Sequence, residues 1–318
     1  MSLGATLSGS LLAVLDRPST WPLALAGFLI RGGWLLVVAP IVVLPTAVGL
    51  ANVIAPLLED IAFGRRLSEL VVLIVVALVV VVGWLIGGGL FAALAELEVV
   101  RRIVPDSGEG QASPVEAADP WTAAWRIVAV RLAAHVPFAI VLVWGATRIA
   151  SVGYAELTVP SDVTVPAPWR IATGAPDAIV GIVLTWLLGE AIGAMGARRV
   201  ALRGEAARPA LRAAIARFAR SPVRPSLLAL LPTIVLVGVI VLTGIAAGTA
   251  LDAVRSGFAL DDASAGTTAL LVVFVALFAG GIMLVALTTA WRAAIWTFDA
   301  VAHGSGTFGG GGSTRTGD

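Results

Sequence analysis

Residues 70–95 read LVVLIVVALVVVVGWLIGGGLFAALA, an apolar run in which no side chain carries a charge. An α-helix needs about 20 such residues to cross the roughly 30 Å of hydrocarbon in a lipid bilayer. An apolar run of this length therefore predicts a membrane-spanning helix.

The composition of the whole chain agrees with this prediction. Of the 318 residues, 58% are hydrophobic and 13% are charged, and the mean hydropathy is +0.98. Soluble domains contain about 45–50% apolar and about 25% charged residues, because their surfaces must face water. Most of this chain is therefore expected to face lipid.

Six runs in the chain are long and apolar enough to cross a bilayer. They cover approximately residues 33–57, 70–95, 132–152, 178–197, 226–251 and 268–290. The predicted fold class is all-α, a polytopic membrane bundle of six transmembrane helices. The polar stretch 106–119 is expected to be a loop, and the glycine-rich tail 304–318 is expected to be disordered.

Arginine is concentrated in alternate connections between the predicted spans. The fourth connection contains Arg198, Arg199, Arg203, Arg208, Arg212, Arg217, Arg220 and Arg224, and the second contains Arg101, Arg102 and Arg126. The third and fifth connections hold Arg170 and Arg255 beside aspartates, and Arg65 and Arg66 in the first connection are outnumbered. Because cytoplasmic loops carry the excess of basic residues, both termini are predicted to be cytoplasmic.

An internal repeat is predicted from three prolines that each follow a charged residue, Pro18, Pro120 and Pro209. Proline in the first helical turn behind a cap such as Asp119 is a helix start signal. Each proline opens a segment with apolar residues at i, i+4 and i+7, which are Trp21, Leu25 and Phe28, then Trp121, Trp125 and Val128, then Leu211, Ile215 and Phe218. The three segments close on Arg31, Arg131 and Arg220. Each is expected to be an amphipathic helix at the membrane interface.

The repeat predicts how the chain is divided into segments. A surface segment, 1–17, precedes a single membrane domain, 18–303. This domain consists of three units, near 18–119, 120–208 and 209–303, and each unit is an interfacial helix followed by a transmembrane hairpin. Arginines at cytoplasmic span ends and tryptophans in the headgroup zone also explain part of this pattern without any repetition.

Ionisable side chains inside the predicted spans are the candidates for chemistry, because they are costly in lipid. Glu190 precedes Arg198 by eight residues, which places it roughly 12 Å inside the cytoplasmic boundary. His135 follows Arg131 by four residues, so the two share a helical face. Because the third and fourth spans are antiparallel, Glu190, His135 and Arg131 can meet. Two functional interpretations of such a cluster are that it carries a proton or that it holds a polar headgroup. The favoured interpretation is structural, and in it the cluster only fixes the packing of the helices.

The third amphipathic segment is the most basic of the three. Its residues Arg212, Arg217 and Arg220 are candidates for contact with anionic lipid headgroups. The simpler interpretation is that they only obey the rule that basic residues stay in the cytoplasm.

Other classes of function have little support in the sequence. The chain has no cysteine, no lysine and two histidines, which argues against thiolate nucleophiles, Schiff-base lysines and histidine metal sites. No hydrolase, metalloprotease or phosphate-loop motif is present. The net charge of +1 does not suggest nucleic acid as a partner. No cofactor is expected, and an intramembrane enzyme is the least favoured class.

The proline-led segment followed by a hairpin, at Pro18, Pro120 and Pro209, resembles uncharacterised bacterial six-span proteins grouped with the membrane domain of glycerophosphodiester phosphodiesterases. The resemblance covers residues 18 to about 303 and is architectural, so it implies no activity. Six spans behind an entry helix also look like the permease subunit of an ABC exporter, although no coupling motif is present.

Two hypotheses about function follow. In the first, the protein is a non-enzymatic component of a prokaryotic plasma membrane that organises the membrane, binds lipid or binds a partner protein, with a homo-oligomer as one such assembly. The prokaryotic assignment comes from the absence of lysine and the abundance of Ala, Gly and Val, which are typical of a GC-rich genome. The alternative is a transporter or permease subunit.

Overall fold

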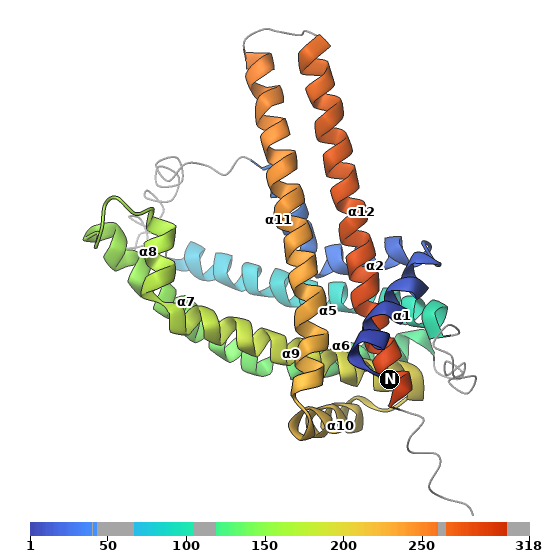
Figure 1. The fold of residues 1–318 in the computed structure, drawn as a ribbon. Helices are drawn as coiled ribbons and strands as arrows, with labels where there is room; N and C mark the ends of the chain where they lie inside the picture. Colours follow the sequence, from blue (N-terminus) through green and yellow to red (C-terminus); the bar gives the residue numbers. More distant parts are fainter. Residues whose placement is uncertain (40, 43–66, 105–118, 260–264, 304–318) are drawn as a thin grey trace, which may run out of the picture. The chain divides into compact units, whose positions relative to one another are not determined.

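Every regular element in the described residues of the computed structural model is a helix (Figure 1). The structure describes residues 1–39, 41–42, 67–104, 119–259 and 265–303. The helices are α1 (Leu3–Leu15), α2 (Thr20–Phe28), a π-helical turn η1 (Leu29–Gly33), α3 (Trp34–Val38), α5 (Leu67–Ile103), α6 (Pro120–Ala134), α7 (Val136–Thr158), α8 (Ala167–Gly174), α9 (Pro176–Arg203), α10 (Ala207–Arg220), α11 (Val223–Ala259) and α12 (Ala265–Ala302). The predicted all-α class is confirmed.

Six of these segments are long and apolar enough to cross a membrane. Within the described residues they are Thr20–Val38, Ser68–Ile103, Val136–Thr158, Pro176–Arg203, Val223–Phe258 and Ala265–Ala302. Three of them contain 36 to 38 residues, which is a helix of about 55 Å at 1.5 Å per residue. Since the hydrocarbon is roughly 30 Å thick, these three helices extend beyond it. The repetition of three hairpins stays a prediction.

The first candidate span among the described residues overlaps the predicted interfacial helix. The sequence predicted an interfacial helix from Pro18 to Arg31 and a span over residues 33–57. In the structure the first candidate span is Thr20–Val38, and residues 43–57 lie outside the described part of the chain. The physical reason is that no charged residue occurs between Arg17 and Arg31, so the segment is apolar on all sides. The helix deforms at Arg31, where Gly32 adopts a φ of 104° that favours glycine.

The helix start predicted behind Asp119 is confirmed. The Asp119 carboxylate accepts hydrogen bonds from the backbone N–H groups of Trp121 (3.4 Å) and Thr122 (3.2 Å), and Pro120 occupies the first helical position. These bonds satisfy donors that the first turn of a helix leaves without partners. The helix continues past the predicted end at Arg131 to Ala134.

Replacing Asp119 with Ala is expected to cost about 1 kcal/mol of the free energy of unfolding, because the cap bonds are lost. Denaturant titration in mixed micelles measures this change, and faster hydrogen exchange of the Trp121 and Thr122 amides is expected with it. Asp119→Asn is the matched control, because asparagine caps about as well as aspartate. Equal destabilisation by both substitutions would show that the cap is not the cause.

The third predicted amphipathic helix is α10. It begins two residues before Pro209 and ends at the predicted Arg220. A tight turn separates it from α9, in which Gly204 has a φ of 65° and donates its N–H to the carbonyl oxygen of Val200 at 3.0 Å. This C-cap conformation favours glycine and reverses the chain at once.

The described chain falls into two compact units. The first consists of residues 1–20, 97–234 and 290 onward, and the second of residues 21–96 and 235–289. In the first unit, α9 packs against α6, α7 and α10. Figure 1 shows α7 and α9 running alongside each other, with α10 near the C-terminal end of α9. Their core contains Ala134, Ala191, Ile192, Ala194, Met195, Ala214, Leu228, Ala229, Ile295 and Trp296, and Leu3 and Leu7 of α1 pack against it.

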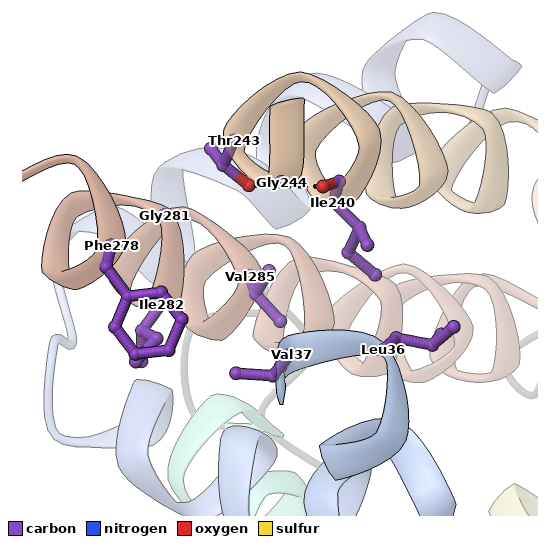
Figure 2. A pocket seen from close by; sticks show the side chains of 9 residues that line it. All are labelled: Leu36, Val37, Ile240, Thr243, Gly244, Phe278, Gly281, Ile282 and Val285. Atoms are coloured by element: carbon purple, nitrogen blue, oxygen red, sulfur yellow. Dashed lines mark hydrogen bonds between the residues drawn. The ribbon is translucent and has the colours of Figure 1, made fainter. Parts of the chain in front are cut away.

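In the second unit, α3, α11 and α12 line a small pocket (Figure 2). The pocket is lined by Leu36, Val37, Ile240, Thr243, Gly244, Phe278, Gly281, Ile282 and Val285. Its one hydroxyl, that of Thr243, donates to the carbonyl oxygen of Val239 in its own helix at 2.6 Å. The lining is therefore apolar in effect and offers no polar group to orient a ligand.

Candidate functional site

Glu190 lies at the centre of a polar cluster in the first unit. Its Oε1 is 3.5 Å from His135 Nε2, and its Oε2 is 3.9 Å from Arg131 Nη1. The three residues that the sequence suggested can meet therefore do lie together. A fourth residue, Arg292 of α12, makes the shortest contact, with 2.5 Å between its Nη2 and Glu190 Oε2.

The backbone break between α6 and α7 positions His135. This residue is the C-cap of α6, and its Nδ1 is 2.8 Å from the carbonyl oxygen of Arg131. The imidazole lies against Gly189 of α9, where an added Cβ would be 2.8 Å from the His135 Cδ2 atom. The absence of a side chain at Gly189 and Gly193 lets α6 approach α9 closely. Both ionic contacts of His135 and Arg131 with α9 depend on this approach.

The sequence did not assign Arg292 to this cluster. The guanidinium of Arg292 also lies over the Trp186 ring, 5.9 Å from its centroid, in a cation–π geometry. The sequence does mark Arg292 as a residue near the end of a span, since it is the first charged residue after the apolar run 268–290. No local pattern shows, however, that this arginine lies beside α9 rather than another helix.

Within the described residues, the Glu190 carboxylate is shared by several basic or polar side chains. Two guanidinium groups, which remain protonated in proteins, share one carboxylate, and the imidazole adds a further polar group. The four side chains are between 16% and 21% exposed, so each is largely buried.

The depth predicted for Glu190 was counted from Arg198, and the structure corrects this reference point. Arg198 is 1% exposed and bonds to Thr297 Oγ1 (3.1 Å) and the carbonyl oxygen of Ala293 (2.9 Å). It is therefore buried by protein and does not mark the membrane boundary.

A second ionic cluster surrounds Asp299 near the C-terminal end of α12. The carboxylate is 1% exposed and accepts from Arg217 Nη2 (2.6 Å) and Arg224 Nε (2.9 Å). Arg224 also donates to the carbonyl oxygen of Met1 at 3.0 Å. These contacts join α12 to α10, α11 and the chain's N-terminal residue. The signal in the sequence is the acidic residue within the apolar run IWTFDAV, since an acidic side chain in such a run needs a partner.

The three predicted lipid contacts do not all lie on the outer face of α10. Arg212 and Arg220 are exposed, whereas Arg217 is bound to Asp299 and points into the protein. A buried carboxylate already holds the Arg217 guanidinium, and contact of Arg217 with lipid stays a prediction. Arg208 is exposed as well, and within the described residues none of the three exposed arginines forms an ion pair. Ile215 lies between them on the outer face and is 47% exposed.

No protein-family model, curated protein or solved structure matches this chain. The architectural resemblance drawn from the sequence therefore stays a prediction. The six membrane-length apolar helices found in the described residues indicate a multi-pass integral membrane protein.

Proposed function

We propose that this protein is a non-enzymatic component of a prokaryotic plasma membrane that binds anionic lipid headgroups through the outer face of α10. The observation that carries this proposal is the division of α10 into two faces. Ala210 and Ala214 are at most 1% exposed, while Arg208, Arg212 and Arg220 are exposed.

The inner face keeps α10 against the membrane helices. An added Cβ at Gly196 of α9 would lie 3.7 Å from the carbonyl oxygen of Ala210 and 3.8 Å from Ala214 Cβ. Leu211 and Phe218 pack against the core of the first unit. The helix is therefore held in place by apolar contacts, and its outer arginines are not needed for that packing.

The outer face has the composition of a surface that lies among headgroups. Arginine supplies bidentate donors for phosphate, and an exposed isoleucine between arginines is favoured where hydrocarbon is within reach. A basic residue near an anionic leaflet contributes about 1 kcal/mol. Three arginines together correspond to roughly a hundredfold in binding. The distribution of arginine among the connections, which predicts this face to be cytoplasmic, also supports the proposal.

The absence of native cysteine allows a direct test. A fluorophore that responds to its environment, attached at Ala219→Cys on the outer face, is expected to enter a less polar environment as phosphatidylglycerol replaces phosphatidylcholine in the vesicles. The combined substitution of Arg208, Arg212 and Arg220 by glutamine should remove most of this response. Addition of 0.5 M NaCl should weaken the response of the unsubstituted protein, because salt screens exposed charges.

Arg148→Gln is the matched control, because Arg148 is an exposed arginine on α7 with a loose 3.9 Å contact to Asp177. It should leave the lipid response unchanged. A label that reports the same environment in neutral and anionic vesicles would refute the proposal. Such a result would favour the alternative in which α10 docks a partner protein, as a permease subunit docks its ATPase.

A further inference from the structure

We infer that the end of α7, the connection after it and α8 form an interfacial anchor, which inserts apolar side chains into the ester layer of the lipid bilayer. The inserted surface, here called the α7–α8 patch, consists of Tyr154, Leu157, Val159, Val163 and Trp169. It lies at the end of α9 opposite to α10, and it does not depend on the function proposed for α10.

The α7–α8 patch contains the three most exposed large apolar side chains of the described residues. Val163 is 84% exposed, Val159 78% and Tyr154 73%, and the other two members of the patch are also mostly exposed. An exposed group of large apolar side chains marks a surface that binds a membrane or another protein. The patch therefore needs an apolar partner.

The position of the patch follows from the two candidate spans on either side of it. Val136–Thr158 and Pro176–Arg203 are both long and apolar enough to cross a bilayer, so the connection 159–175 joins them at one membrane surface. The 28 residues of α9, about 42 Å of helix, separate this connection from α10. The patch and the outer face of α10 therefore belong to opposite faces of the membrane.

The helix α8 folds back along α7 and does not extend away from it (Figure 1). An added Cβ at Gly153 would be 3.6 Å from Ile171 Cδ1, and one at Gly174 would be 2.7 Å from Val152 Cγ1. These contacts lie roughly 8 Å before the end of α7, at 1.5 Å per residue. Its place beside the last turns of a span puts α8 at the depth of the membrane interface.

The ionic contacts of this region hold the connection against α7. Residues 149–175 carry three charges, those of Glu156, Asp162 and Arg170. Arg170 Nε lies 2.9 Å from Glu156 Oε2, and both side chains are at most 16% exposed. Arg170 also donates to the carbonyl oxygens of Glu156 (3.2 Å) and Val165 (2.7 Å), and Asp162 accepts from the Thr164 hydroxyl at 2.7 Å. The two most buried charges thus fix the backbone, and the apolar side chains are left on the outside.

The chemistry of the patch identifies lipid as its partner. Tyr154, the single tyrosine of the chain, and Trp169 each combine a large apolar ring with a polar tip, and such side chains are concentrated at membrane interfaces. The exposed apolar face of α7 continues into the patch, because Val143 and Tyr154 are three helical turns apart and share a face. The net charge of residues 149–175 is −1, so anionic headgroups gain nothing over neutral ones.

A single-cysteine label measures the depth of the patch, because the chain has no native cysteine. A bimane fluorophore at Leu157→Cys is placed in phosphatidylcholine vesicles that contain nitroxide-labelled lipid. Quenching by a nitroxide next to the ester group should exceed quenching by one at the end of the acyl chain, on the order of twofold. Leu184→Cys on α9 is the matched control and should show the reverse order, since Leu184 is an exposed leucine further inside a span.

Two outcomes of this measurement would overturn the inference. A label that aqueous iodide quenches freely and lipid nitroxides do not would place the patch in water. A label that neither quencher reaches would show that protein covers the patch, and a dependence on the protein-to-lipid ratio would identify that protein as a second copy of this chain.

The dependence on charge separates the anchor from α10. Neither phosphatidylglycerol nor added salt should change the quenching ratio at Leu157→Cys, because the contact is apolar. A ratio that falls when salt is added would show that charge attraction holds the patch at the membrane and would overturn the inference. The label at Ala219→Cys tests α10 separately, so either proposal can fail alone.

Arg170→Gln tests whether the inward ionic contacts position the patch. With the label at Val163→Cys, loss of the Arg170 contacts should lower the preference for the nitroxide at the ester group on the order of twofold. Arg148→Gln is the matched control and should leave the preference unchanged, since Arg148 makes only a loose 3.9 Å contact with Asp177. Equal values for the two variants would overturn the inference that α8 is held as an anchor.

Discussion

Replacing Asp299 with Asn is expected to lower the free energy of unfolding by about 3–5 kcal/mol. The carboxylate is 1% exposed and pairs with two guanidinium groups, those of Arg217 and Arg224. Asparagine is nearly isosteric, so the change removes charge without leaving a cavity. Two partly buried cations then face each other without a counter-ion, which is the situation in which loss of one ionic partner is most costly.

The measurement is an SDS titration of the purified protein in mixed micelles, followed by circular dichroism. Asp252→Asn is the matched control, because Asp252 pairs with Arg255 across a single helical turn and is 76% exposed. An exposed pair of this kind contributes at most about 0.5 kcal/mol. If both substitutions have effects of this smaller size, Asp299 does not organise the ends of α10, α11 and α12.

The Asp299 cluster also shows which part of the fold can be predicted from local sequence. The six spans follow from the lengths of apolar runs, and the start of α6 follows from Asp119 and Pro120, because both features act within a few residues. The meeting of Glu190 with His135 and Arg131 follows from helical spacing and one antiparallel connection. Each of these arguments needs only neighbours in the chain.

Contacts between distant helices escaped prediction for a physical reason. Arg292 reaches Glu190 across 102 residues, and Arg224 reaches the carbonyl oxygen of Met1 across 223. An arginine near the end of an apolar run is equally compatible with a headgroup, a water-exposed surface or a buried partner. Only the packing of α12 beside α9 distinguishes these environments, and helix order in a membrane depends on shape more than on apolar pattern.

The same reasoning applies to the first candidate span and to the ion pair of Arg217. Apolar periodicity at Trp21, Leu25 and Phe28 resembles that of an amphipathic helix, yet an amphipathic helix also needs a polar face, which is missing between Arg17 and Arg31. Arg217 has the same sequence context as Arg212 but occupies the opposite side of α10, where Asp299 is the nearest counter-ion.

Replacing Gly189 with Val is expected to lower the free energy of unfolding by about 3 kcal/mol, since overpacking costs about 1–3 kcal/mol and a lost hydrogen bond about 1 kcal/mol more. An added Cβ would be 2.8 Å from the His135 ring, which cannot move aside freely. Its Nδ1 is bonded to the Arg131 carbonyl oxygen and its Nε2 contacts Glu190. The valine must therefore separate α6 from α9 or displace the imidazole from Glu190.

Gly87→Val is the matched control for this substitution, because Gly87 is also in a membrane-spanning helix and an added Cβ there would meet no atom within 4 Å. Both changes introduce the same β-branched residue, so their intrinsic helical preferences cancel in the comparison. The difference between the two free energies of unfolding then reports the contact at His135 alone. A difference below about 1 kcal/mol would mean that the ring yields at little cost, and that close approach of α6 to α9 is not what holds the Glu190 cluster together.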